Sequence, residues 1–64
     1  PIASREAIKA LKAAGFVVVG QKGSHVQLKH PQRSGRVTVP HPKPELPIGT
    51  IRSIERQSGI KLRK

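Results

Sequence analysis

Cysteine is absent from this sequence, and Phe16 is its only aromatic residue. Without cysteine the chain has no disulfide and no thiolate ligand for a metal ion. Recognition of single-stranded bases by stacking requires aromatic side chains, so one phenylalanine argues against RRM-like and OB-like binding. If the partner is a nucleic acid, we therefore expect lysine and arginine to contact its backbone and read its shape.

Long apolar segments are also missing. The longest purely apolar run covers residues 16–19, whereas a membrane-spanning helix needs about 20 such residues. Residues 1–6 contain no apolar segment, so we expect no signal peptide. No predicted helix combines a broad apolar face with a basic one, so we expect no membrane partner. The lack of cysteine is compatible with a reducing compartment, and we expect a cytoplasmic protein.

Acidic residues are scarce as well, since three Asp and Glu stand against 13 Lys and Arg, a formal net charge of +10. Such an excess in 64 residues implies an anionic partner, with nucleic acid ahead of an acidic protein. The length indicates a single small domain spanning residues 1–64, which buries only about 60% of the surface of its unfolded chain.

The first element is predicted to be a helix over residues 4–14. Ser4 is a favoured N-cap residue, and Glu6 complements the positive end of the helix dipole. Apolar residues such as Leu11 recur at helical spacing on one narrow stripe. Gly15 can adopt the left-handed conformation that ends a helix.

Three short segments rich in β-branched residues follow, and they predict strands at residues 16–20, 25–30 and 36–40. We expect residues 20–24 to turn the chain, and Pro40 to end the third strand. The alternation of apolar and polar residues favours an antiparallel meander with one apolar face.

A proline-rich segment at residues 41–47 is predicted to be a rigid connector. The spacing of its prolines also fits a weak docking ligand for a partner. Isoleucines then recur at helical spacing and predict a second helix at residues 48–58. Gly59 is its expected C-cap, and Ile60 can fold back onto the last turn. We expect the basic tail, residues 61–64, to fray.

The order α-β-β-β-α predicts an α+β fold with a three-stranded antiparallel sheet and two helices on one face. Both helices need apolar cover, which the sheet offers on a single side. The side chains expected on that side are Val26, Leu28, Val37 and Val39. The side chains expected on the open side are His25, Gln27, Lys29, Arg36 and Thr38.

His25 is the leading candidate for chemistry because it lies where a polar turn becomes a strand. The ordinary pKa of histidine allows it to gain or lose a proton near neutral pH. On RNA, a neutral imidazole can take the proton of a ribose 2′-OH, which then attacks the adjacent phosphate; an imidazolium can protonate the leaving 5′-oxygen. This reaction needs no metal and no cofactor. The sequence is equally compatible with His25 being a surface histidine that has no functional role.

Several neighbours of His25 are candidate substrate-binding residues. Charge on the transition state would be stabilised by Lys22, Lys29 and Arg36, the nearest cations on the predicted sheet. Gly23 and Ser24 are typical turn residues that position His25, and they also allow phosphate to approach the backbone.

The two other histidines carry weaker predictions. A structural role is favoured for His30, which is in phase with the apolar residues of its strand. His41, in the proline-rich segment, could contact substrate or pack, and both readings stay open. With no cysteine, few carboxylates and no helical histidine pair, we expect no metal site.

The ordered set of motifs resembles the HicA toxin family over nearly the whole chain. The motifs are Gly23-Ser24-His25 before a strand, Val37-Thr38-Val39-Pro40, His41-Pro42, Leu46-Pro47, and Gly49-Thr50-Ile51-Arg52-Ser53-Ile54. The resemblance implies a fold like that of double-stranded-RNA-binding domains and an mRNA interferase activity. It also implies a HicB-like antitoxin as partner and His25 as the catalytic residue, which favours catalysis over the surface reading.

Two alternatives differ in class from a ribonuclease toxin. One is a non-catalytic module of the same fold that binds structured RNA by shape and phosphate contacts. The other is a basic interaction protein that needs only an acidic protein partner. Cleavage of RNA separates the first alternative from the enzyme, and the absence of affinity for RNA identifies the second.

Overall fold

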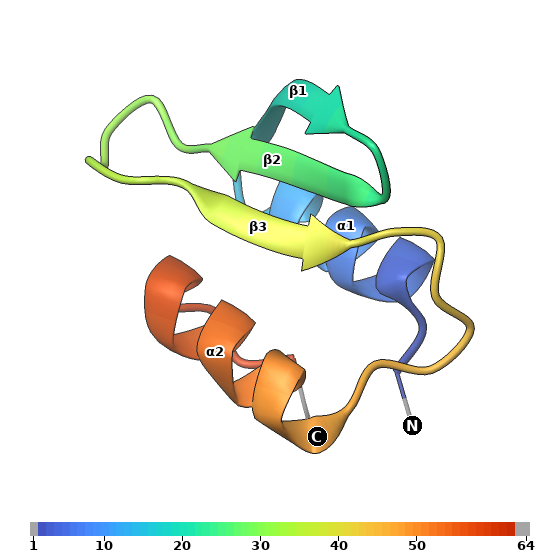
Figure 1. Ribbon diagram of the computed structural model, residues 1–64. Coiled ribbons are helices and arrows are strands. Elements are labelled where there is room, and N and C mark those ends of the chain that lie inside the picture. The colour runs from blue at the N-terminus through green and yellow to red at the C-terminus, as the bar shows by residue number, and fades with distance from the viewer. Residues whose placement is uncertain (1, 63–64) are drawn as a thin grey trace.

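The computed structural model describes residues 2–62; Pro1, Arg63 and Lys64 lie outside the described residues. The elements follow the predicted order α-β-β-β-α (Figure 1). They are α1 (Ser4–Ala13), β1 (Val17–Lys22), β2 (His25–Lys29), β3 (Val37–Pro40) and α2 (Ile48–Ser58). No helix within residues 2–62 is long and apolar enough to cross a membrane.

The three strands form an antiparallel meander in the order β1-β2-β3. On β2 the buried side chains Val26 and Leu28 alternate with His25 and Lys29, which are exposed. Directly opposed residues of antiparallel strands share a face, so Val39 joins Val26 on the apolar side. The predicted apolar side of the sheet is therefore confirmed.

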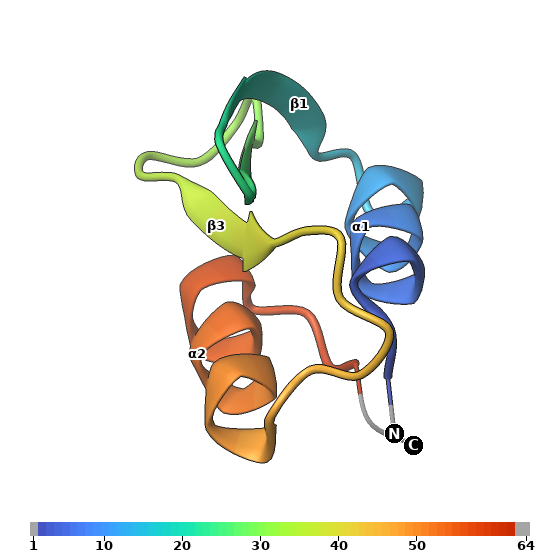
Figure 2. The ribbon, with the colours of Figure 1, turned by 45° about the vertical axis from the view of Figure 1, so that its right-hand side comes forward.

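The core lies between this apolar side and the helices (Figure 2). Helix α1 contacts β1 and β3, and α2 packs beside β3. The buried hydrophobic residues of the core are Ala7, Leu11, Phe16, Val26, Leu28, Val37, Val39, Leu46, Ile51 and Ile54. Each large aliphatic side chain buried here stabilises the fold by roughly 1.5–3 kcal/mol.

The boundaries of the strands differ from the prediction at several residues. β1 begins at Val17 rather than at residue 16. It runs to Lys22 rather than ending at Gly20, because the turn needs only two residues and a bulge between Val18 and Gly20 absorbs one extra residue. β2 ends at Lys29 rather than at residue 30, before Pro31, and β3 begins at Val37 rather than at residue 36.

The start of α1 also differs, because Ala3 and not Ser4 occupies the N-cap position. The Ala3 N–H donates to Glu6 Oε1 at 3.2 Å. Ser4 is 1% exposed, and its hydroxyl lies 2.7 Å from His41 Nδ1. The hydroxyl oxygen accepts the Lys43 N–H at 2.8 Å. Ser4 therefore fastens the segment after β3 to the first turn of α1, and the predicted capping role is wrong.

The proline-rich segment is held by further backbone hydrogen bonds. The Ser4 N–H donates to the Lys43 carbonyl at 2.9 Å, and the Leu46 N–H donates to the Ile2 carbonyl at 2.7 Å. These bonds tie the segment to the N-terminal residues, in agreement with the predicted connector.

The end of α2 follows the prediction in part. Gly59 is the C-cap, with a φ of +72°, and Ile60 packs against the core. The tail was expected to fray from residue 61, but Leu62 also packs against the core, and its N–H donates to Glu55 Oε2 at 2.8 Å. The rest of the predicted tail lies outside the described residues.

We expect Ser4→Ala to lower the free energy of unfolding by about 1–3 kcal/mol, because the part-buried Lys43 N–H and His41 ring lose a hydrogen-bond partner. Urea denaturation followed by far-UV circular dichroism measures this loss. Ser34→Ala is the matched control, since Ser34 is exposed and its change should stay within about 0.5 kcal/mol. Equal stability of the two variants would contradict the structural role of Ser4.

Two glycine substitutions should have effects of opposite sign. Gly15 has a φ of +103°, and an added Cβ would lie 2.8 Å from His30 Nε2. Gly15→Ala should therefore destabilise the protein by roughly 1–3 kcal/mol. Gly49 lies in α2 with nothing within 4 Å of an added Cβ. Gly49→Ala should stabilise by about 0.5–1 kcal/mol. Thermal unfolding of both variants tests the pair, and a gain in stability for Gly15→Ala would refute this account.

Candidate nucleic-acid interface

A two-residue turn fixes the position of His25. Lys22 at the end of β1 pairs with His25 at the start of β2, which leaves Gly23 and Ser24 as the turn. Gly23 has a φ of +57°, and Ser24 has no positive φ. This combination fits a type II′ turn, which matches the twist of the flanking strands. The His41 N–H also donates to the Ser24 carbonyl at 2.7 Å, so the turn is held from a third segment.

The His25 side chain is exposed on the open side of the sheet. Its Cα partners are Lys22 on β1 and Pro40 on β3, so all three side chains share this side. Within residues 2–62 its ring has no hydrogen-bond partner. The imidazole is therefore accessible to a ligand that approaches the open side.

The open side gathers cations without carboxylates. The side chains on it are Val17, Lys22, His25, Gln27, Lys29, Thr38 and Pro40, which confirms the alternation predicted for β2 and β3. The three acidic residues of the chain are elsewhere, with Glu6 on α1, Glu45 in the segment before α2, and Glu55 on α2. The potential over the open side is therefore positive and favours an anionic ligand.

Arg36 reaches this side from the residue just before β3. Its Nη1 donates to Gln27 Oε1 at 2.8 Å, across the two strands. Gln27 lies two residues from His25 on the same side of β2, so this bond holds a guanidinium on the row that contains the imidazole. Sequence reasoning named Arg36 as a site residue but gave no role to Gln27, whose alternation with His25 was the available signal.

The two lysines predicted beside His25 lie at different distances along the sheet. Lys22 is its direct cross-strand partner. Lys29 is four residues away on β2, which is about 13 Å at the usual rise of a strand. Lys29 therefore shares the side but does not adjoin the imidazole, and it can contact only a ligand that extends along β2.

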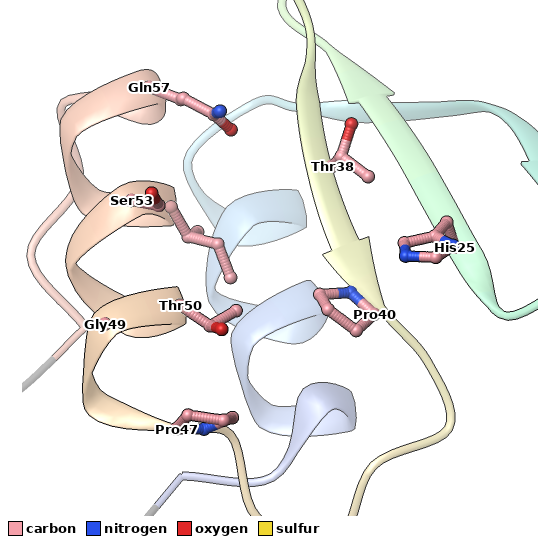
Figure 3. Close-up of a pocket in the computed structure, with 9 residues that line it drawn as sticks. His25, Thr38, Pro40, Pro47, Gly49, Thr50, Ser53 and Gln57 are labelled. Carbon is pink, nitrogen blue, oxygen red and sulfur yellow. The ribbon is translucent and has the colours of Figure 1, made fainter.

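A groove of about 480 Å³ separates the His25 end of the sheet from α2 (Figure 3). Its walls are His25, Thr38 and Pro40 from the sheet, and Pro47, Gly49, Thr50, Ser53, Ile54 and Gln57 from the α2 side. Arg56 Nη2 lies 3.4 Å from Ser53 Oγ, at this wall. The groove thus joins the open side of the sheet to a polar face of α2.

The contribution of α2 to the groove was missed from the sequence. Thr50, Ser53 and Gln57 are spaced by three and four residues, which indicates a shared helix face. That spacing was a visible signal, but it does not reveal which neighbour the face meets. Only the packing of α2 beside β3 places it opposite His25.

The other two histidines are held in structural contacts away from the open side. The His30 ring meets Phe16 edge to face at 5.1 Å between centroids, and its Nδ1 accepts the Gln32 N–H at 3.0 Å. The His41 ring lies against Ser4 at the start of α1. The structural role favoured for His30 agrees with this geometry, and for His41 the structure shows packing.

No three histidine, aspartate or glutamate side chains among residues 2–62 gather where they could hold a metal ion. The open side offers one accessible imidazole, the guanidinium of Arg36 held on Gln27 and the ammonium of Lys22, and of these three groups the imidazole lines the groove. Such a set can exchange a proton with a ligand and stabilise negative charge on it.

Comparison with known proteins identifies the family. A search of curated proteins finds no match to this chain. The family model described as the HicA toxin of bacterial toxin–antitoxin systems matches residues 4–60, which covers both helices and all three strands. This chain therefore belongs to the HicA toxin family.

Proposed function

We propose that this toxin is an endoribonuclease that cleaves mRNA in the cytoplasm of its prokaryotic host and thereby arrests growth. The observation that carries the proposal is His25, an exposed imidazole at the end of a groove on a cationic sheet face without carboxylates. Membership of a toxin family supports a harmful activity, and the charge of +10 favours a polyanionic substrate.

In the proposed reaction, His25 accepts the proton of a ribose 2′-OH as the 2′-oxygen attacks the neighbouring phosphorus. The bond from phosphorus to the 5′-oxygen breaks, and that oxygen takes a proton from the imidazolium or from water. The products are a 2′,3′-cyclic phosphate and a free 5′-OH. Each proton transfer is one that an imidazole performs near neutral pH, and none requires a metal ion.

Charge on the phosphorane-like transition state would be stabilised by Arg36 and Lys22. Arg36 offers a planar guanidinium that can donate two hydrogen bonds to phosphate oxygens, and Gln27 restrains its position. Lys22 is a mobile point charge opposite His25. We assign Arg36 the larger share because its geometry is fixed before the substrate arrives.

The turn and the far end of β2 would bind the rest of the RNA. Gly23 has no Cβ, so phosphate can approach the backbone of the Gly23-Ser24 turn closely. Lys29 would contact a phosphate some 13 Å along β2 from the imidazole. The proposed likeness to double-stranded-RNA-binding domains would fit recognition by backbone contacts rather than by base stacking.

A HicB-like antitoxin is the proposed partner. An acidic protein that covers the His25 side would block access of RNA and neutralise the charge that attracts it. This arrangement would keep the toxin inactive until the antitoxin is lost, as in a stress response.

Replacement of the imidazole should remove cleavage and leave the fold intact. We expect His25→Ala to lower the rate of RNA cleavage by about 100- to 10,000-fold, the usual contribution of general acid–base catalysis. End-labelled RNA is incubated with purified protein in EDTA, and the products are analysed for cyclic phosphate. Circular dichroism should show an unchanged thermal midpoint, because His25 is exposed.

Full cleavage or full toxicity of His25→Ala at normal expression would refute the catalytic role of this residue. RNA that is bound but left intact by the unmodified protein would instead identify the non-catalytic binding module. Failure to bind RNA at all would favour the basic interaction protein.

Loss of the restrained guanidinium should reduce turnover more than loss of an equal charge elsewhere. We expect Arg36→Ala to lower kcat/KM for RNA by about 10- to 100-fold. Arg52→Ala is the matched control, since Arg52 is an exposed arginine that lies on α2 and not on the open side of the sheet. Its effect should stay below about threefold and disappear in higher salt. Equal effects of the two variants would show that only net charge matters.

A further inference from the structure

β1 leaves an apolar strand uncovered at the edge of the sheet. All six of its residues are exposed, including Val17 at 54%, Val18 at 39% and Val19 at 50%. The strand order β1-β2-β3 gives β1 one strand neighbour within residues 2–62. Its outer backbone groups have no strand partner within residues 2–62, and the bulge between Val18 and Gly20 leaves the residues on either side of it for regular pairing. Exposed apolar edge strands are uncommon in proteins that act alone.

The valines line a defined hollow and are not isolated apolar residues on a flat surface. A depression of about 340 Å³ is lined by Val17 and Val19 together with Lys29, His30 and Pro31. The contact of the His30 ring with Phe16, which is 5% exposed, fixes one wall. The hollow is formed before any partner binds, so docking there costs little ordering of the toxin.

Charge selects the kind of partner that fits this edge. Lys22 closes β1, and Lys29 lines the hollow opposite Val17, so cations flank the apolar strip. A second copy of the chain would bring another net charge of +10 against the first. Repulsion disfavours that occupant, whereas an acidic polypeptide gains both apolar contact and charge complementarity.

We infer that the antitoxin adds an acidic β-strand to the outer edge of β1 and seats apolar side chains in the hollow beside Val17 and Val19. This inference rests on the proposed neutralisation by an acidic antitoxin. Main-chain hydrogen bonds to β1 would supply affinity, and alternate side chains of the added strand would supply specificity.

This mode of binding explains how an antitoxin bound at the edge would block His25. Lys22 on β1 is the direct neighbour of His25 on β2. A strand added outside β1 lies two strand spacings, or about 10 Å, from β2. The body of the antitoxin that carries this strand would then stand over the open side and exclude RNA from His25.

The test compares two toxin variants that lose similar exposed apolar surface at different places. Val17→Thr with Val19→Thr keeps β-branched residues in β1 but makes the strip polar. Ile48→Thr is the matched control, because Ile48 is 53% exposed but lies on α2. Affinity for a purified acidic HicB-like antitoxin is measured by calorimetry, and RNA cleavage is measured on the same samples.

We expect the double variant to lose at least about tenfold in affinity for the antitoxin and the control to change by less than about twofold. Both variants should cleave RNA as the unmodified toxin does, since neither changes the groove. In hydrogen exchange of the intact complex, amides of β1 should gain protection. Growth arrest by the double variant should persist when the antitoxin is co-expressed.

Three results would overturn the inference. The first is an affinity of the double variant for the antitoxin equal to that of the unmodified toxin. The second is a lack of new hydrogen-exchange protection in β1 of the complex. The third is a dimer of the free toxin that the two threonine substitutions dissociate. Failure of the proposed function has a different signature, since the unmodified toxin would then leave RNA intact or fail to bind the antitoxin. Edge binding by a toxin without ribonuclease activity would still be seen in affinity and exchange.

Discussion

The pairing of β2 with its two neighbours is the constraint on which the rest of this structure depends. Side chains alternate along a strand, so a slip of one residue would move His25 to the core and Val26 to solvent. The two-residue turn at Gly23-Ser24 sets the register on one side. The bond from the His41 N–H to the Ser24 carbonyl supports it from the other. The core and the reactive face are thus specified by the same alignment.

In a small domain with few acidic residues, the many lysines and arginines repel one another. The core is confined to one side of the sheet and two narrow helix stripes, and the cations lie on the outside. Buried polar contacts, such as Ser4 with Lys43, connect segments that hydrophobic contact alone would leave loosely joined. The open side carries Lys22, Lys29 and Arg36 without a carboxylate, and its positive charge would favour both the proposed RNA substrate and an acidic antitoxin.

The open side and the β1 edge meet at Val17 and Lys29, but most of their side chains differ in chemistry. The first is polar and cationic, with Arg36 restrained by Gln27. The second is an apolar strip bordered by lysines. A substrate made of phosphate and ribose has chemistry for the first surface, and a polypeptide has chemistry for the second. One small sheet can thus present neighbouring surfaces to the proposed RNA substrate and to the proposed antitoxin.

The sequence by itself determined the order of the elements, the apolar and polar sides of β2 and β3, and the exposure of His25, because period-two alternation and glycine or proline punctuation are local properties. It did not determine the cap of α1. The Ser4 hydroxyl contacts Lys43 and His41 instead of capping the helix, and these residues are too distant in the sequence for local patterns to predict the contact. It could not reveal the bond between Arg36 and Gln27 or the groove wall of Thr50, Ser53 and Gln57. The bond forms only once β3 pairs with β2. The groove wall exists only once α2 packs beside β3, because the side of a helix that faces a neighbour is decided by how the whole core fills space.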